Sequence, residues 1–212
     1  MNLPCERISR KEQKIARTRA NRLLCDLRKK LKGTYKMTFR LAGSGSWGTM
    51  VRDPNGKYDL DYQIIITKNS KDYEKSVING PRHVKDTIRS AFDTLRNKGE
   101  SFENSTTAIT LVNKNESVPY SIDFVILTEI DGRMNIIKQN KHVNPPIYTW
   151  NQLPQHFDKT YRYFKGLEPE EKRKIIDKVI IRKCKEKYHS NSDISSSEIL
   201  VQEINKHKQM NS

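Results

Sequence analysis

The sequence is poor in cysteine and in long apolar runs, and these shortages limit the classes of protein it can be. Its three cysteines, Cys5, Cys25 and Cys184, are far apart and odd in number. This usage argues against a disulfide framework and favours a reducing cytoplasm. No apolar run approaches the length of a membrane span, and residues 1–7 contain no signal-peptide core. We therefore expect a cytoplasmic protein with no membrane partner.

Several catalytic and metal-binding motifs are also missing. There is no internal repeat, no Walker-type phosphate loop and no Ser/His/Asp arrangement that spacing supports. The histidines are scattered, with no Cys/His spacing for zinc; they are His83, His142, His156, His189 and His207. The sequence therefore gives no support to a zinc site, a P-loop enzyme or a serine hydrolase.

Acidic residues are scarce relative to basic ones. The chain has 40 Lys and Arg against 25 Asp and Glu, for a net charge of +15. Such a surplus favours polyanions, which include RNA and nucleoside triphosphates. A lysine-rich solvated surface is the alternative explanation, and charge alone does not separate an RNA-binding enzyme from one that binds only nucleotides.

The hydrophobic pattern predicts a mixed fold in this chain of 212 residues. The expected helices are 9–32, 83–98, 150–164, 172–188 and 198–208. The expected strands are 34–41, 58–67, 105–112, 118–127 and 133–138. Polar segments predict loops or linkers at 68–82, 113–116, 141–146 and 190–197. We predict an α/β (α+β) fold in which a twisted mixed sheet carries helices on one face, with a core over 1–143 and a helical region over 144–212.

The stretch from Gly43 to Ile66 combines a small-residue turn with paired acids. Gly43-Ser44-Gly45-Ser46-Trp47-Gly48-Thr49 reads as a turn whose backbone N–H groups suit a triphosphate. Asp59 and Asp61 follow on alternate positions of a strand, so their side chains share a face.

Three further residues affect how this stretch is interpreted. Asp123 lies between Ile122 and Phe124 in a later strand, where a carboxylate is costly unless it is exposed, paired or bound to a cation. Trp47 is expected in the core, and Asp53 in the turn before the paired acids. Three carboxylates from two strands are ligands that suit hard cations.

This pattern resembles the DNA polymerase β nucleotidyltransferase superfamily. The shared features are Gly-Ser, then Gly-Thr after three residues, then Asp-x-Asp opening an apolar strand, and a lone Asp on a later strand. The Gly-Ser-x-x-x-Gly-Thr motif and the long N-terminal helix are most similar to those of the OAS-like and cGAS/DncV-like (CD-NTase) branch. The resemblance implies a nucleotidyltransferase fold. It also implies transfer of a nucleoside monophosphate from a nucleoside triphosphate to a hydroxyl of a nucleotide or RNA, with release of pyrophosphate.

The resemblance also assigns roles to residues. Asp59, Asp61 and Asp123 would hold two Mg²⁺ or Mn²⁺ ions, and Asp123 would orient or deprotonate the attacking hydroxyl. Gly43, Ser44, Ser46 and Thr49 would bind the nucleotide. Basic candidates for neutralising the triphosphate are Arg52, Lys172, Lys174 and Lys178. The branch usually carries a larger C-terminal helical domain, which leaves the product open. Two alternatives stay open: an AMPylating-type, protein-modifying enzyme of a toxin or antiviral defence system, and a non-catalytic nucleic-acid-binding module.

Overall fold

A computed structural model describes residues 5–113, 120–140, 142–153, 158–186 and 194–211. These residues form two compact units, each built from separate stretches of the chain. Unit 1 comprises Met1–Arg10, Ala42–Tyr58 and Pro154–Ser212, and unit 2 comprises Lys11–Leu41 and Asp59–Leu153. The division at residue 144 stays a prediction. None of the helices in the described part of the chain is long and apolar enough to cross a membrane.

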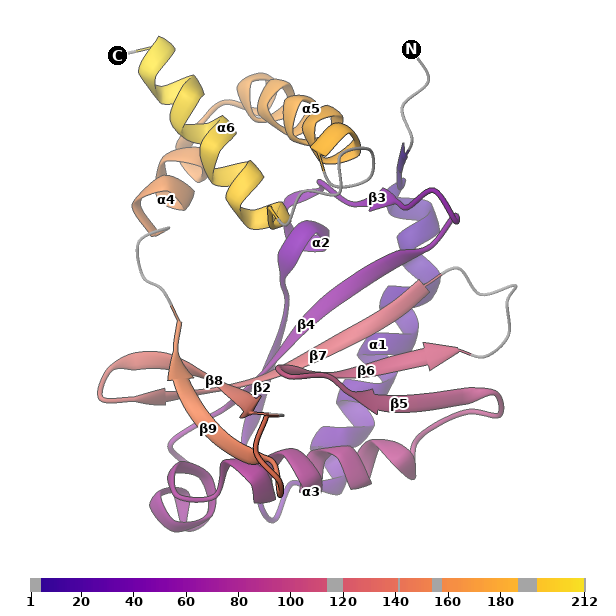
Figure 1. Cartoon of the computed structure of the whole chain (residues 1–212), viewed down its shortest axis with the longest axis vertical. Coiled ribbons are helices and arrows are strands. Elements are labelled where there is room, and N and C mark those ends of the chain that lie inside the picture. The colour runs from indigo at the N-terminus through magenta and orange to yellow at the C-terminus, as the bar shows by residue number, and fades with distance from the viewer. Residues whose placement is uncertain (1–4, 114–119, 141, 154–157, 187–193, 212) are drawn as a thin grey trace. The chain divides into compact units, whose positions relative to one another are not determined.

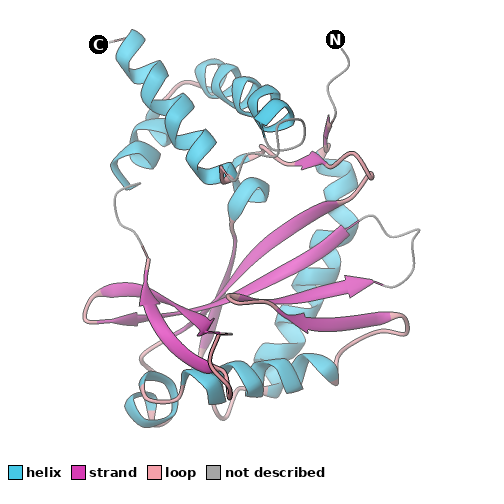
Figure 2. Ribbon diagram, in the orientation of Figure 1, coloured by secondary structure: helices cyan, strands magenta, loops and turns pink. Residues whose placement is uncertain are grey.

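A seven-stranded sheet forms the centre of unit 2 (Figures 1 and 2). Five strands follow the order β2-β4-β7-β6-β5, while β8 pairs with β7 and β9 pairs with β8. The strands are β2 (Met37–Leu41), β4 (Tyr58–Ile66), β5 (Glu100–Asn104), β6 (Ala108–Asn113), β7 (Tyr120–Ile130), β8 (Arg133–Asn140) and β9 (Ile147–Gln152). The expected combination of a sheet with packed helices is confirmed.

Strand β4 alternates between a buried face and an accessible face. Its buried side chains are Tyr58, Leu60, Tyr62, Ile64 and Ile66. The other face carries Asp59 and Asp61, so the prediction that these two acids share a face is confirmed. A slip of one residue would place both carboxylates in the core, and the hydrophobic pattern therefore sets the register.

Helices α1 (Arg10–Lys30) and α3 (Pro81–Asp93) cover the sheet of unit 2 (Figure 1). α1 buries Ala16, Ala20, Leu23, Leu24 and Leu27, as the periodicity predicts, but Ile15, which the same periodicity places with them, is 70% exposed. α3 inserts Phe92, whose ring centroid lies 4.9 Å from that of Phe102 and 4.7 Å from that of Phe124. Because Phe124 and Asp123 are neighbours on β7, they point to opposite faces. The carboxylate of Asp123 therefore lies on the face away from this aromatic cluster.

A buried ion pair joins α1 to β5. Arg19 Nη2 lies 2.5 Å from Glu100 Oε2, and the two side chains are 11% and 4% exposed. Arg19 also donates to the carbonyl of Leu95, and the backbone N–H of Asn97 donates to Glu100. Arg19 is thus a partly buried structural residue that fixes α1 to the segment before and within β5.

Several predicted elements differ from the structure of unit 2. The helix predicted over 150–164 is wrong in its first part, because Trp150 lies in β9 and its Nε1 donates to the carbonyl of Val77. Residues 68–82, predicted as a loop, include a π-helix, η1 (Tyr73–Ile78). α3 ends at Asp93 and not at residue 98, and β5 was not predicted. The predicted turn over 113–116 lies, apart from Asn113, outside the described residues, as does the start of the strand expected at 118.

Unit 1 is mainly helical. Its elements are β1 (Glu6–Arg7), α2 (Gly43–Trp47), β3 (Val51–Arg52), α4 (Asp158–Gly166), α5 (Pro169–Glu186) and α6 (Ser196–Met210). The core of α4, α5 and α6 consists of Phe164, Ile175, Val179, Ile199, Leu200 and Ile204. Ser195 begins α6 with a capping box, in which its hydroxyl accepts from the backbone N–H of Glu198 and the Glu198 side chain accepts from the backbone of Ser195. Of the linker predicted over 190–197, residues 190–193 lie outside the described residues.

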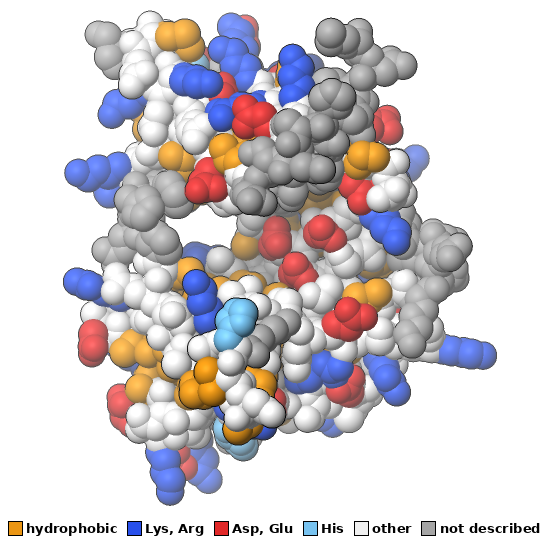
Figure 3. Space-filling view, viewed as in Figure 1, with side chains coloured by type: hydrophobic (Ala, Val, Ile, Leu, Met, Phe, Trp, Pro, Cys, Tyr) orange, Lys and Arg blue, Asp and Glu red, His pale blue; other side chains and the backbone are white. Residues whose placement is uncertain are grey.

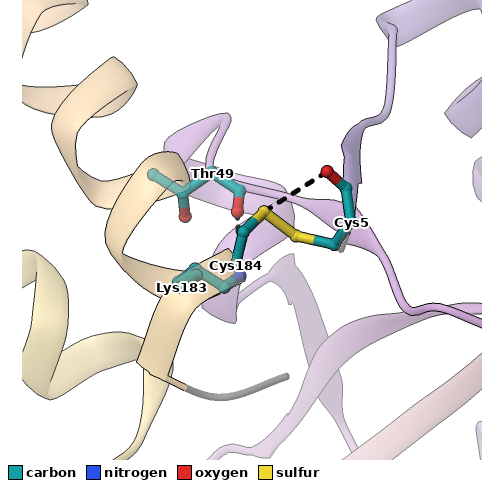
Figure 4. Close-up of a disulfide and its surroundings, with 4 residues drawn as sticks. All are labelled: Cys5, Thr49, Lys183 and Cys184. Carbon is teal, nitrogen blue, oxygen red and sulfur yellow. Dashed lines mark hydrogen bonds between the residues drawn. A yellow bond between two sulfur atoms is a disulfide. The ribbon is translucent and has the colours of Figure 1, made fainter. Parts of the chain in front are cut away.

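A disulfide joins Cys5 to Cys184, which corrects the expectation drawn from cysteine usage (Figure 4). Their Cα atoms are 5.3 Å apart across a sequence separation of 179 residues. Cys184 on α5 is fully buried beside Val51 and Ile180. Sequence spacing missed the pair because β1 pairs with β3 and the fold brings both to α5, which no local pattern reveals.

Candidate active site

Three acids lie on the accessible face of the sheet in unit 2. Asp59 is exposed and Asp61 is partly buried on β4, while Asp123 is partly buried on the adjacent strand β7. Figure 3 shows a group of acidic side chains (red) over the middle of this sheet. The sheet therefore brings the two segments that carry the predicted acids to neighbouring strands.

Hydroxyl groups from the sheet hold two of these carboxylates. Thr110 Oγ1 on β6 donates to Asp123 Oδ1 at 2.5 Å. Ser121 on β7 donates to Asp59 Oδ1. Sequence reasoning missed both hydroxyl residues. The signal for Ser121 was its position two residues before Asp123, on the same face of the strand.

The surroundings of Asp123 favour its protonated form. Burial raises the pKa of its carboxyl, the hydrogen bond from Thr110 lowers it, and the negative charge of Asp59 raises it again. The net effect is that the pKa of Asp123 lies above the ordinary value for aspartate. The influence of Asp59 also shows that the two carboxylates interact across β4 and β7.

The donor chemistry of this face suits a hard cation, although the acids are not closely grouped. Among the described residues, no three His, Cys, Asp or Glu side chains are arranged to hold a metal ion. Carboxylate oxygens are nevertheless the ligands that Mg²⁺ and Mn²⁺ prefer. A half-buried carboxylate that faces a second one is also stabilised by a bound cation. The residues present therefore fit such an ion through Asp59 and Asp123, with Asp61 beside Asp59 on the same face of β4.

The small-residue segment lies in unit 1, where it forms the short helix α2 in place of the expected turn. Gly43 and Gly48 have positive φ angles of 54° and 73°, values that glycine tolerates best. Ser46 Oγ donates to the Gly43 carbonyl at 2.8 Å. The backbone N–H of Thr49 donates to the Ser44 carbonyl at 3.1 Å, and Thr49 is 1% exposed. Of the predicted nucleotide-binding residues, Gly43 and Ser46 are exposed and Ser44 is partly exposed.

A buried lysine supports this segment from within unit 1. Lys183 on α5 is 3% exposed, and its Nζ donates to the Thr49 carbonyl at 2.8 Å (Figure 4). Sequence reasoning missed it, because a lysine in a basic helix gives no sign of burial. Among the basic residues that were predicted, Lys174 pairs with Glu170 at 3.1 Å and Arg52 donates to the Gly56 carbonyl.

Trp47 and Asp53 have the structural roles expected of them. The Trp47 ring stacks on Tyr161 with centroids 4.8 Å apart and meets Phe164 edge-on at 5.8 Å. Asp53 Oδ1 accepts from the backbone N–H groups of Asn55 and Lys57 and closes the turn before β4.

Comparison with solved structures identifies the fold. The c-di-GMP synthase CdnE from Capnocytophaga granulosa superposes with a TM-score of 0.60 at 17% identity, over 98% of this chain and 64% of that one. CdnC of E. coli MS115-1, solved in complex with HORMA-deltaN, gives a TM-score of 0.59 at 17% identity, over 94% and 61%. Vibrio cholerae DncV with bound 3′-deoxy ATP gives 0.55 at 15% identity, over 94% and 52%.

The chain has the nucleotidyltransferase fold of these neighbours. It spans between about half and two thirds of the length of these three enzymes. No protein-family model matches the sequence, and no curated protein matches it either. At these identities the likeness establishes the nucleotidyltransferase fold, and function must be argued from the site.

Proposed function

We propose that this chain is a metal-dependent nucleotidyltransferase that transfers a nucleoside monophosphate from a nucleoside triphosphate to a hydroxyl acceptor. The observation that carries the proposal is the placement of Asp59 and Asp61 on one face of β4, with Asp123 on the adjacent strand β7. The nucleotidyltransferase fold supports it, as does the ATP analogue that DncV binds in its solved structure.

The reaction is a substitution at the α-phosphorus. The acceptor oxygen forms a bond to this phosphorus while the bond to the oxygen that bridges to the β-phosphorus breaks. Pyrophosphate leaves with that bridging oxygen, and the acceptor hydroxyl gives up its proton. Two divalent cations, Mg²⁺ or Mn²⁺, would neutralise the triphosphate and make the acceptor hydroxyl more acidic. Asp59, Asp61 and Asp123 are the residues that would hold them.

Asp123 is the proposed base for the acceptor proton. Burial raises the pKa of its carboxyl, and this makes it a better proton acceptor than an exposed aspartate. Asp59 and Asp61 would hold the cations together with Asp123. Only Met50–Tyr58 separate Thr49 from Asp59 in the sequence, so one short segment carries both groups.

Gly43 and Ser44 are the residues we propose for the triphosphate. The Ser46 hydroxyl is already bonded to the Gly43 carbonyl, and Thr49 is buried. Ser44 therefore has the hydroxyl best suited to a phosphate oxygen, while Ser46 and Thr49 contribute by fixing the shape of the segment.

A polyanionic acceptor is consistent with the net charge of +15. The exposed basic residues of α1 contribute to this charge; they are Arg10, Lys11, Lys14, Arg22, Arg28, Lys29 and Lys30. We propose RNA or a nucleotide as the acceptor on this basis, since basic faces bind phosphates without sequence preference.

The test is a transfer assay with each α-³²P-labelled triphosphate in turn, in Mg²⁺ or Mn²⁺, with products resolved on thin-layer plates and gels. We expect label in a new nucleotide or RNA species, and none for the variant Asp59→Asn/Asp61→Asn. The matched control is Asp72→Asn, which removes an exposed carboxylate from unit 2 and keeps a residue that tolerates the positive φ of 47°.

Other outcomes point to the alternatives. Label on added protein would indicate an AMPylating-type enzyme. Salt-sensitive RNA binding that is indifferent to Asp59→Asn, with no transfer and no triphosphate binding, would indicate a nucleic-acid-binding module and would refute the catalytic proposal.

A further inference from the structure

Two hydrogen bonds connect the acids of the candidate site to hydroxyls on neighbouring strands. Thr110 and Asp123 lie directly opposite each other in the antiparallel pairing of β6 and β7. Thr110 Oγ1 donates to Asp123 Oδ1 at 2.5 Å. Side chains of directly opposed residues point to the same face of a sheet, so the strand register itself brings the hydroxyl to the carboxylate.

A second hydroxyl-to-carboxylate bond joins β7 to β4, the next strand of the sheet. Ser121 precedes Asp123 by two residues and therefore lies on the same face of β7. Its hydroxyl donates to Asp59 Oδ1 on β4. Hydroxyl-to-carboxylate bonds thus run across three adjacent strands, from β6 to β7 and from β7 to β4.

These bonds counter two forces that would displace the carboxylates. Asp123 is desolvated, and Asp59 and Asp123 repel each other as like charges. A donor to each carboxylate offsets both effects and also selects one orientation. Each of these bonds is made to Oδ1 of its carboxylate and does not use Oδ2.

We infer that Thr110 and Ser121 are positioning residues, which orient the carboxylates of Asp123 and Asp59 for a divalent cation. The inference rests on the metal site of the proposed function. Outer partners that hydrogen-bond to metal ligands fix ligand orientation, and their loss costs about 10–100-fold in metal affinity or activity.

The decisive variant is Thr110→Val, which keeps the β-branched shape and removes only the hydroxyl. Thr110→Ser restores the hydroxyl and should restore metal binding. Ser121→Ala tests the second bond. Thr38→Val is the matched control, because Thr38 lies exposed on β2, two strands away from β7.

The measurement is Mn²⁺ affinity, read from the electron paramagnetic resonance signal of free Mn²⁺, with and without a non-hydrolysable ATP analogue. Melting temperature in EDTA is recorded for every variant. We expect about 10–100-fold weaker Mn²⁺ binding for Thr110→Val and Ser121→Ala. Affinity should be within about threefold of wild type for Thr110→Ser and Thr38→Val.

The two proposals fail in different ways. Wild-type affinity in Thr110→Val and Ser121→Ala would overturn the positioning role and leave the nucleotidyltransferase proposal standing, even if both variants melted earlier in EDTA. Mn²⁺ binding that is undetectable in the wild type, with and without the ATP analogue, would overturn the metal site and the positioning role together.

Discussion

Replacing Glu100 by alanine should destabilise unit 2 far more than a surface substitution would. Glu100 is 4% exposed at its side chain and accepts from Arg19 through both carboxylate oxygens. The substitution leaves the Arg19 guanidinium, itself 11% exposed, without its counter-ion. Removing one partner of a buried pair costs about 3–5 kcal/mol, because the remaining charge is uncompensated.

The pH dependence of this pair has a definite sign. Burial raises the pKa of Glu100, but hydrogen bonds from Arg19 and Asn97 outweigh it, so the net shift is below the ordinary value. A depressed folded-state pKa contributes stability above the unfolded-state pKa of about 4.3. The pair therefore acts in full at neutral pH, and its contribution is lost as pH falls through the folded-state pKa.

Urea denaturation at pH 7 and at pH 3 measures both effects. The difference between wild type and Glu100→Ala should be about 3–5 kcal/mol at pH 7 and smaller at pH 3. The double variant Arg19→Met/Glu100→Leu should recover most of the loss, since an apolar pair leaves no buried charge. The exposed pair of Asp26 and Lys29 provides the control, where Asp26→Asn should cost under about 1 kcal/mol. A loss below about 1 kcal/mol for Glu100→Ala would refute the reasoning.

Three other predictions concern the site, the disulfide and a helix cap. In metal-free protein, Asp59→Asn should lower the pKa of Asp123 measured by carboxyl ¹³C NMR, because the charge of Asp59 raises it; an unchanged pKa would contradict their proximity. Cys5→Ser should destabilise the oxidised protein by up to about 5 kcal/mol, from the loop-closure entropy of a long loop; melting with and without reductant should show this, while Cys25→Ser should have no such effect. Ser195→Ala should cost about 1 kcal/mol by removing the cap of α6, and calorimetry showing no loss would contradict the capping role.

Local patterns predicted the elements that carry the acids. The alternation in β4 placed Asp59 and Asp61 on one face because burial of the other face leaves one register. Asp123 was found by its chemistry, since an acid between apolar residues needs a partner. Its partner Thr110 could not be found this way, because that bond depends on the pairing of β6 with β7.

The remaining differences between the predicted and the observed structure arise from tertiary contacts. The periodicity over 150–164 predicted one helix. Tyr161 and Phe164 do lie in α4, but Trp150 lies in β9, where its Nε1 donates to the carbonyl of Val77. Nothing in the sequence indicated that Lys183 is buried or that Arg19 is largely buried, each against a specific acceptor. Burial of a long basic side chain depends on the partner that the fold provides, which no local pattern contains.

The disulfide between Cys5 and Cys184 closes residues 5–184 into a covalent ring. All of unit 2 lies between these two cysteines in the sequence, so a protease that cuts once within it opens the ring without releasing a fragment. A protein nicked in this way would migrate as one species on a non-reducing gel and as two after reduction.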